Sequence, residues 1–184
     1  MNPVLKIFRF QFEIILFIIF VLISENVFSQ DVGSAYQRDS LILAAREYMH
    51  AARFCALITI DSTGSPDVRT MDPFEPDENM VIWLGTNRNS RKVREIRNNP
   101  KVNLFYTKNK GFGYVSIKGI AKLVDDKAKK SVLWKEEWKN FYDQHKENYI
   151  LIKVIPEKLE LLNYKKGIKG DKRTWKTPAV EFNY

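Results

Sequence analysis

The feature that most limits the fold is a series of short apolar runs, each bounded by turn residues. Several of them alternate apolar and polar side chains, as half-buried strands do. Short turns connect most of them, which indicates antiparallel neighbours. We therefore expect a mainly β protein, a six- to seven-stranded antiparallel barrel with marginal helices. The runs are residues 54–61, 68–74, 79–86, 102–107, 114–123, 149–156 and 158–164.

Three helices are expected at the margins of the sheet. Residues 39–52 place apolar side chains on one stripe, and residues 90–98 form a short helix between the third and fourth strands. Asp125 and Asp126 open a third helix. Its expected apolar stripe is Trp134, Trp138, Phe141 and His145. The basic tail from residue 165 is expected to form a loop and a short terminal strand.

The first 29 residues have the pattern of a secretory signal peptide. Lys6 and Arg9 precede an apolar run at residues 14–23. Val27 and Ser29, with small or medium-sized side chains, occupy the −3 and −1 positions of a cleavage site before Gln30. The run is shorter than the ~20 residues of a membrane span. The pattern predicts cleavage before Gln30, a single domain at 30–184, and a periplasmic or secreted protein without a stable membrane span. The alternative is a retained N-terminal membrane anchor.

The formal charge of +8 belongs to the mature domain, because the removed segment holds two basic and two acidic residues. A basic domain can meet nucleic acid, anionic lipid or a phosphorylated small molecule, and export makes nucleic acid the weakest of these. Cys55 is the only cysteine, and its strand-like surroundings predict a packed core thiol. His50 and His145 are expected to be helix residues at the surface, and they have no partners at metal-ligand spacing, so no metal site is expected.

The short helix begins with an unusual charge pattern. Ser90 is a good N-cap, but Arg91 and Lys92 follow it, although a helix start normally favours acidic residues. Free N–H groups, a hydroxyl and two cations together form a plausible phosphate site. Arg69 in the strand at residues 68–74 could reach the same anion. A solvated basic face is the alternative explanation.

Three segments together resemble the pyridoxamine 5′-phosphate oxidase-like, flavin-binding split-barrel proteins. They are "VRTM", "VIWLGTNRNSRKVREIRNNPKVNLFY" and "GYVSIKGIAKLVDD". The later segments "VLWKEEWKNFYD" and "YILIKVIPEKLELLNY" are similar to the general-stress-protein branch of this family. The resemblance covers roughly residues 38–165. It implies an FMN-binding split barrel whose flavin sites lie at a homodimer interface.

The resemblance also implies which residues bind the cofactor. An arginine with two following residues lines the flavin, the strand before the helix contacts the ring through its backbone, and the helix start holds the phosphate. In this sequence these are Arg69, Thr70 and Met71; Trp83, Leu84, Gly85 and Thr86; and Ser90, Arg91 and Lys92. Tyr114 is a candidate for contact with the flavin of the second protomer. Trp138 is a candidate ring-stacking residue, and core or interface packing of Trp134 and Trp138 is the alternative.

The sequence departs from the pyridoxamine phosphate oxidases proper. Gly113 and Tyr114 stand where those enzymes carry an Arg-Gln pair, and their C-terminal Arg/His signature is missing. We therefore expect an exported FMN-dependent oxidoreductase acting on another small substrate, with no catalytic residue assigned. A deazaflavin (F420) is the alternative cofactor, and a non-catalytic protein that binds flavin or another ligand is the alternative function.

The signal-peptide pattern makes a direct prediction. The mature protein begins near Gln30, because Val27 and Ser29 satisfy the small-residue rule after an apolar core. N-terminal mass analysis of the native protein tests this. A native chain that still begins at Met1 would contradict cleavage.

Overall fold

The structure is a computed structural model that describes residues 36–108, 112–142 and 146–183. Residues Tyr36–Tyr184 form one compact unit. The predicted signal peptide at residues 1–29 and the predicted surface residue His145 lie outside the described residues. Among the described residues, no helix is both long and apolar enough to cross a bilayer.

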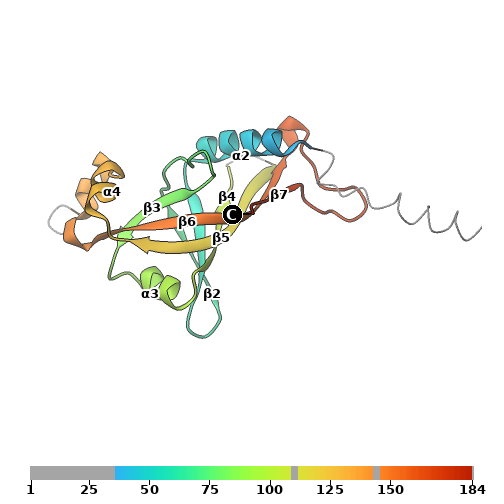
Figure 1. Ribbon diagram of the computed structural model, residues 1–184. Helices are drawn as coiled ribbons and strands as arrows, with labels where there is room; N and C mark the ends of the chain where they lie inside the picture. The colour runs from blue at the N-terminus through green and yellow to red at the C-terminus, as the bar shows by residue number, and fades with distance from the viewer. Residues whose placement is uncertain (1–35, 109–111, 143–145, 184) are drawn as a thin grey trace, which may run out of the picture. The chain divides into compact units, whose positions relative to one another are not determined.

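The unit is built on one antiparallel sheet in the order β2-β1-β4-β5-β6-β3, with β7 added beside β6 (Figure 1). This confirms the mainly β, seven-stranded antiparallel fold expected from the sequence. The strands are β1 (Cys55–Ile60), β2 (Pro66–Met71), β3 (Ile82–Asn87), β4 (Lys101–Tyr106), β5 (Gly113–Val124), β6 (Tyr149–Asn163) and β7 (Ala179–Glu181).

The sheet curls so that its two edge strands, β2 and β3, approach each other. A single bridge between Pro73 and Leu84 joins them, and the Phe74 N–H donates to the Trp83 carbonyl at 2.9 Å. No further pairing between the two edges is present in the described residues. The barrel is therefore split along the β2–β3 seam.

The helices lie outside the sheet (Figure 1). They are α2 (Arg38–Ala52), α3 (Arg91–Asn98), α4 (Lys127–Val132) and α5 (Lys139–Tyr142), with 3₁₀ turns η2 (Glu136–Trp138), η3 (Lys146–Asn148) and η4 (Tyr164–Lys166). The predicted stripe of the first helix is confirmed, because Leu41, Ala44, Ala45 and Tyr48 are buried. The short helix between strands three and four is also confirmed.

The sequence prediction of two strands at residues 149–156 and 158–164 is wrong. They form one continuous strand, β6, which pairs with β5 along its length. Pro156 lacks an N–H donor, and the ladder accommodates it with a register shift between Lys118 and Gly119 that leaves Glu157 without a partner on β5. The predicted break between two strands is in fact a β-bulge within one strand.

The single long helix predicted after Asp126 is also wrong. Asp126 does cap α4 by accepting from the Lys129 N–H at 2.6 Å, but α4 ends at Val132. The chain then turns so that Lys135 binds Asp72 at 2.7 Å and the Pro73 carbonyl at 2.8 Å. This ion pair holds residues 133–135 in a non-helical connection to η2 and α5.

The bulge explains why a glycine stands at position 119. A Cβ there would run into the Ile155 carbonyl oxygen of β6. We expect Gly119→Ala to lower the free energy of unfolding by about 1–3 kcal/mol, because a crowded site must shift to make room. Urea unfolding measures this. Lys122→Ala, at an exposed position of the same strand, serves as the control and should stay within about 0.5 kcal/mol. Equal effects of the two substitutions would contradict the crowding.

Candidate functional site

The start of α3 lies at one end of the barrel. Ser90 occupies the N-cap position as expected, but its side chain makes no capping hydrogen bond, and the first turn contains no acidic residue. The Ser90 hydroxyl instead lies 3.4 Å from the hydroxyl of Thr86 on β3. The backbone N–H groups at this helix start are therefore left without a capping side chain.

Glu95, in the second turn of α3, points into the end of the barrel. It is only 4% exposed. Its carboxylate accepts a hydrogen bond from the Thr59 hydroxyl of β1, and one oxygen lies 2.8 Å from the Arg69 guanidinium of β2. The other oxygen lies 3.1 Å from Arg91. One buried carboxylate thus connects two strands to the helix start.

Asp67 on β2 provides a second anion in the same place. Its carboxylate lies 3.0 Å from Arg91 and 3.9 Å from Arg69. The structure therefore brings both predicted arginines together beside α3. Each of them already has carboxylate partners.

Lys92 has a different environment. Its ammonium donates to the Thr86 hydroxyl at 3.0 Å, and it forms no ion pair with any residue that the structure describes. Burial lowers the pKa of Lys92, and the nearby charge of Arg69 lowers it further, while Glu95 opposes this shift. A lowered pKa means that the surroundings under-stabilise the positive charge. An added anion would stabilise it.

These side chains form a compact set at the β2–β3 seam, which we call the barrel-end cluster. It includes three polar residues that the sequence analysis did not identify, Thr59, Asp67 and Glu95. Their only sequence signals were the i,i+4 spacing of Arg91 and Glu95 and the alternation of Asp67 with Arg69 along a strand. The cluster consists of Thr59, Asp67, Arg69, Thr86, Ser90, Arg91, Lys92 and Glu95.

The remaining predicted residues of β3 lie beside the cluster. Leu84 is fully buried, so only its backbone can face a ligand at the seam. Gly85 lies under the rings of Trp138 and Tyr149, because a Cβ at this position would collide with both. Met71, at the end of β2, belongs to the hydrophobic core.

Trp138 belongs to an aromatic cluster that covers the outer side of β3. Its ring centroid lies 5.5 Å from that of Phe74, 6.2 Å from that of Trp134 and 5.7 Å from that of Tyr149. Trp83, on the same side of β3, packs against this cluster. These contacts are those of a packed aromatic layer over the strand that carries Thr86.

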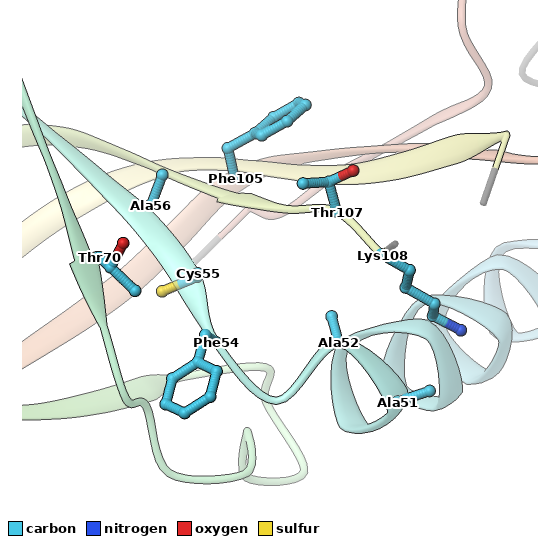
Figure 2. Close-up of a pocket in the computed structure, with 9 residues that line it drawn as sticks. All are labelled: Ala51, Ala52, Phe54, Cys55, Ala56, Thr70, Phe105, Thr107 and Lys108. Atoms are coloured by element: carbon cyan, nitrogen blue, oxygen red, sulfur yellow. The ribbon is translucent and has the colours of Figure 1, made fainter. Parts of the chain in front are cut away.

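Thr70 and Tyr114 lie elsewhere, on the outer face of the sheet. Tyr114 stacks on Phe105 with ring centroids 5.3 Å apart, and its hydroxyl lies 3.0 Å from that of Thr177. Thr70 lines a hollow of about 560 Å³ between β1, β2, the end of β4 and the end of α2 (Figure 2). Within one protomer, the structure does not bring these two residues to the barrel-end cluster.

Cys55 borders the same hollow but is buried, as expected for a core thiol. Burial raises its pKa to about 12. In the part of the chain that the structure describes, no group of three or more histidine, cysteine or acidic side chains could hold a metal ion. His50 lies at the surface, as expected, and pairs with Glu75 at 2.8 Å.

Comparison with known proteins places this chain in a family. The model of the family described as "Pyridoxamine 5'-phosphate oxidase like" matches residues 43–167. General stress protein 26 of Bacillus subtilis (strain 168) is 29% identical over 104 residues, which are 54% of this chain and 73% of that protein.

Solved structures share the fold. A Clostridium acetobutylicum protein described as related to general stress protein 26 matches with a TM-score of 0.65 and 19% identity, over 80% of this chain and 97% of its own. A Nostoc punctiforme protein described as "pyridoxamine 5'-phosphate oxidase-related, FMN binding" matches with a TM-score of 0.55 and 16% identity, over 79% of this chain and 94% of its own.

The barrel is therefore a split barrel of the pyridoxamine 5′-phosphate oxidase-like type, with a polar cluster at its seam. The chain belongs to the pyridoxamine 5′-phosphate oxidase-like family, and its similarity to general stress protein 26 supports the branch expected from the sequence.

The position of Glu95 predicts a pH-dependent stability. Burial raises the pKa of Glu95, but the hydrogen bonds with Thr59 and Asp67 and the charge of Arg69 together outweigh it, so the pKa lies below its ordinary value. Ionised Glu95 therefore stabilises the folded state at neutral pH. This contribution is fully present above about pH 4.3, the ordinary glutamate pKa. It is lost as the pH falls from there through the lowered pKa of Glu95 in the folded state.

We expect Glu95→Gln to lower the free energy of unfolding at neutral pH by about 3 kcal/mol, because it leaves Arg69 without its closest anion. The variant should also lose part of the acid-dependent destabilisation that we expect for the native protein. Urea unfolding between neutral and acidic pH measures both effects. Glu136→Gln, which removes an exposed carboxylate paired with Lys139, is the control. A native-like pH profile for Glu95→Gln would contradict the assignment.

Proposed function

We propose that this protein binds FMN as a homodimer and acts as a flavin-dependent oxidoreductase on a small substrate outside the cytoplasm. The observation that supports this best is the Lys92 ammonium. It is half-buried beside an uncapped helix start and two hydroxyls, and it has no carboxylate partner in the described part of the chain.

The donor set around Lys92 fits a phosphate group. A phosphate needs several N–H or O–H donors and a positive potential, and a helix start supplies both. Here the donors are the Lys92 ammonium, the hydroxyls of Thr86 and Ser90, and N–H groups at the start of α3 that the Ser90 side chain does not cap. Arg69 and Arg91 add positive charge nearby, while Glu95 and Asp67 hold their guanidinium groups in place.

The seam between β2 and β3 fits the rest of the cofactor. In the described residues, β3 pairs with β6 along its whole length and with the β2 side only at Leu84. The backbone of Gly85 and Thr86 therefore has one edge that is not used by the sheet. This edge starts beside the phosphate donors, so one ligand could contact both. The aromatic cluster packs against Gly85 and supports this edge of β3 from behind.

The outer face of β2, β1 and β4 supports assembly as a dimer. Val68 is 61% exposed, and its register neighbour Ile58 and the more distant Phe105 point to the same face. Thr70 and Tyr114 lie on this face as well, away from the cluster of their own protomer. A second copy that covers the face would bury the apolar side chains and could bring Thr70 and Tyr114 near the partner's seam.

FMN would supply the hydride or electron transfer, and the chain would supply binding and polarity. The similarity to a protein described as FMN binding supports FMN. A deazaflavin carries a comparable phosphate and is the second candidate for the same donors. Export is proposed from the signal-peptide pattern of residues 1–29.

The phosphate assignment predicts a selective loss of affinity. Lys92→Ala should weaken FMN binding roughly 10- to 150-fold, the equivalent of one charge-assisted hydrogen bond of about 1.5–3 kcal/mol. Riboflavin lacks the phosphate and should bind the variant and the native protein alike. Fluorescence-quenching titration with both flavins measures the difference.

Arg94→Ala is the matched control, because Arg94 is an exposed cation on the same helix. It should leave both affinities unchanged. Equal losses of FMN and riboflavin in Lys92→Ala would indicate general destabilisation and contradict the phosphate site. Unchanged FMN affinity would favour a solvated basic helix start.

A further inference from the structure

The segment after β6 forms a basic and aromatic surface loop, residues 164–176, which we call the tail loop. It contains six basic residues and one acidic residue, so five of the eight net positive charges of the chain lie within it. All six basic residues are exposed. They are Lys165, Lys166, Lys169, Lys172, Arg173 and Lys176.

The tip of the tail loop is an ordered turn that presents a tryptophan. The Asp171 carboxylate accepts hydrogen bonds from the backbone N–H groups of Arg173 at 3.0 Å and Thr174 at 2.7 Å. The Trp175 N–H donates to the Asp171 carbonyl at 2.9 Å. The only acidic side chain of the loop is therefore used to organise the turn.

Trp175 is held in an unfavourable position for a large apolar residue. Its φ is 60°, a conformation that bulky residues rarely adopt, and its side chain is 79% exposed. Burying an indole would stabilise the fold, yet the turn directs this one outward. Backbone strain together with an exposed apolar side chain is typical of a binding surface.

Two further exposed aromatic residues lie at the base of the tail loop. Phe112 is 84% exposed and Tyr164 is 43% exposed, and the Tyr164 N–H donates to the Phe112 carbonyl at 3.3 Å. Tyr36, the first described residue, also lies here, because its hydroxyl donates to the Gly167 carbonyl at 3.0 Å.

We propose that the tail loop docks the domain on an anionic lipid surface. Exposed lysines attract acidic headgroups, and tryptophan and tyrosine rings favour the boundary between headgroups and acyl chains. The exposed aromatic side chains beside these cations favour lipid over a soluble polyanion, for which the cations alone would suffice. The proposal does not depend on flavin binding, because it uses no residue of the barrel-end cluster.

The test uses residues 30–184 and vesicles of phosphatidylcholine alone or mixed with phosphatidylglycerol in equal parts. Every residue of the two hydrophobic clusters lies within this part. The solved Clostridium acetobutylicum relative is matched over 97% of its own chain, so the fold does not require the first 29 residues. Co-sedimentation should show binding to the mixed vesicles and little binding to pure phosphatidylcholine, and added salt should weaken it.

Two variants separate the contribution of the lysine charges from that of the Trp175 indole. Replacing Lys165, Lys169 and Lys172 by glutamine should weaken binding roughly 100-fold, since each lysine near an anionic surface contributes about a factor of five. Trp175→Asn keeps a residue that tolerates positive φ but removes the indole. It should also weaken binding. It should abolish the blue shift of tryptophan emission that we expect for the native protein with mixed vesicles.

The matched control replaces Arg94, Arg97 and Lys101 by glutamine, which removes the same charge from exposed positions in and just after α3. It should bind mixed vesicles nearly as well as the native protein. Equal loss in the control, or equal binding to both kinds of vesicle, would overturn the proposal. So would binding to heparin or an oligonucleotide without vesicle binding, or a loss of dimerisation in Trp175→Asn by light scattering.

Discussion

The rest of the site depends on one buried carboxylate, Glu95. It binds Thr59 on β1, Arg69 on β2 and Arg91 on α3, and so connects the short helix to the open side of the barrel. Because two guanidinium groups lie close together there, neutralising anions are needed for the helix to pack. Glu95 and Asp67 meet this need on the inner side. Lys92 has a hydroxyl partner, Thr86, in place of a carboxylate among the described residues.

The split of the barrel explains why this cluster can be reached at all. A closed barrel would have no free strand edges, but β2 and β3 meet only at Pro73 and Leu84 in the described residues. Beyond this bridge the edge of β3 runs toward Thr86, while the aromatic layer around Trp138 supports its outer side. Because the barrel-end cluster lies at one end of the barrel, its polar side chains do not interrupt the apolar core.

The sequence predicted most of the architecture because short strands and tight turns are local features. The alternation in β5, the hairpin of β1 and β2, and the helix after β3 were all visible in residue patterns. The sequence did not reveal the bulge at Pro156 or the turn after Val132, because both depend on distant partners: Gly119 in one case and Asp72 in the other. The burial of Glu95 also depends on distant partners, Thr59 and Arg69. Its i,i+4 spacing from Arg91 gave no sign of this burial, because such a charge pair on a helix usually lies in solvent.

The burial of Cys55 has a practical consequence. Its thiol is the only one in the chain, and with a pKa of about 12 it carries almost no thiolate at neutral pH. Alkylating reagents would therefore spare it, and a cysteine introduced anywhere on the surface would be the single reactive thiol. Spectroscopic labels could be attached at chosen positions without first removing a native cysteine, and the proposed dimer could then be tested by distance measurements in the intact protein.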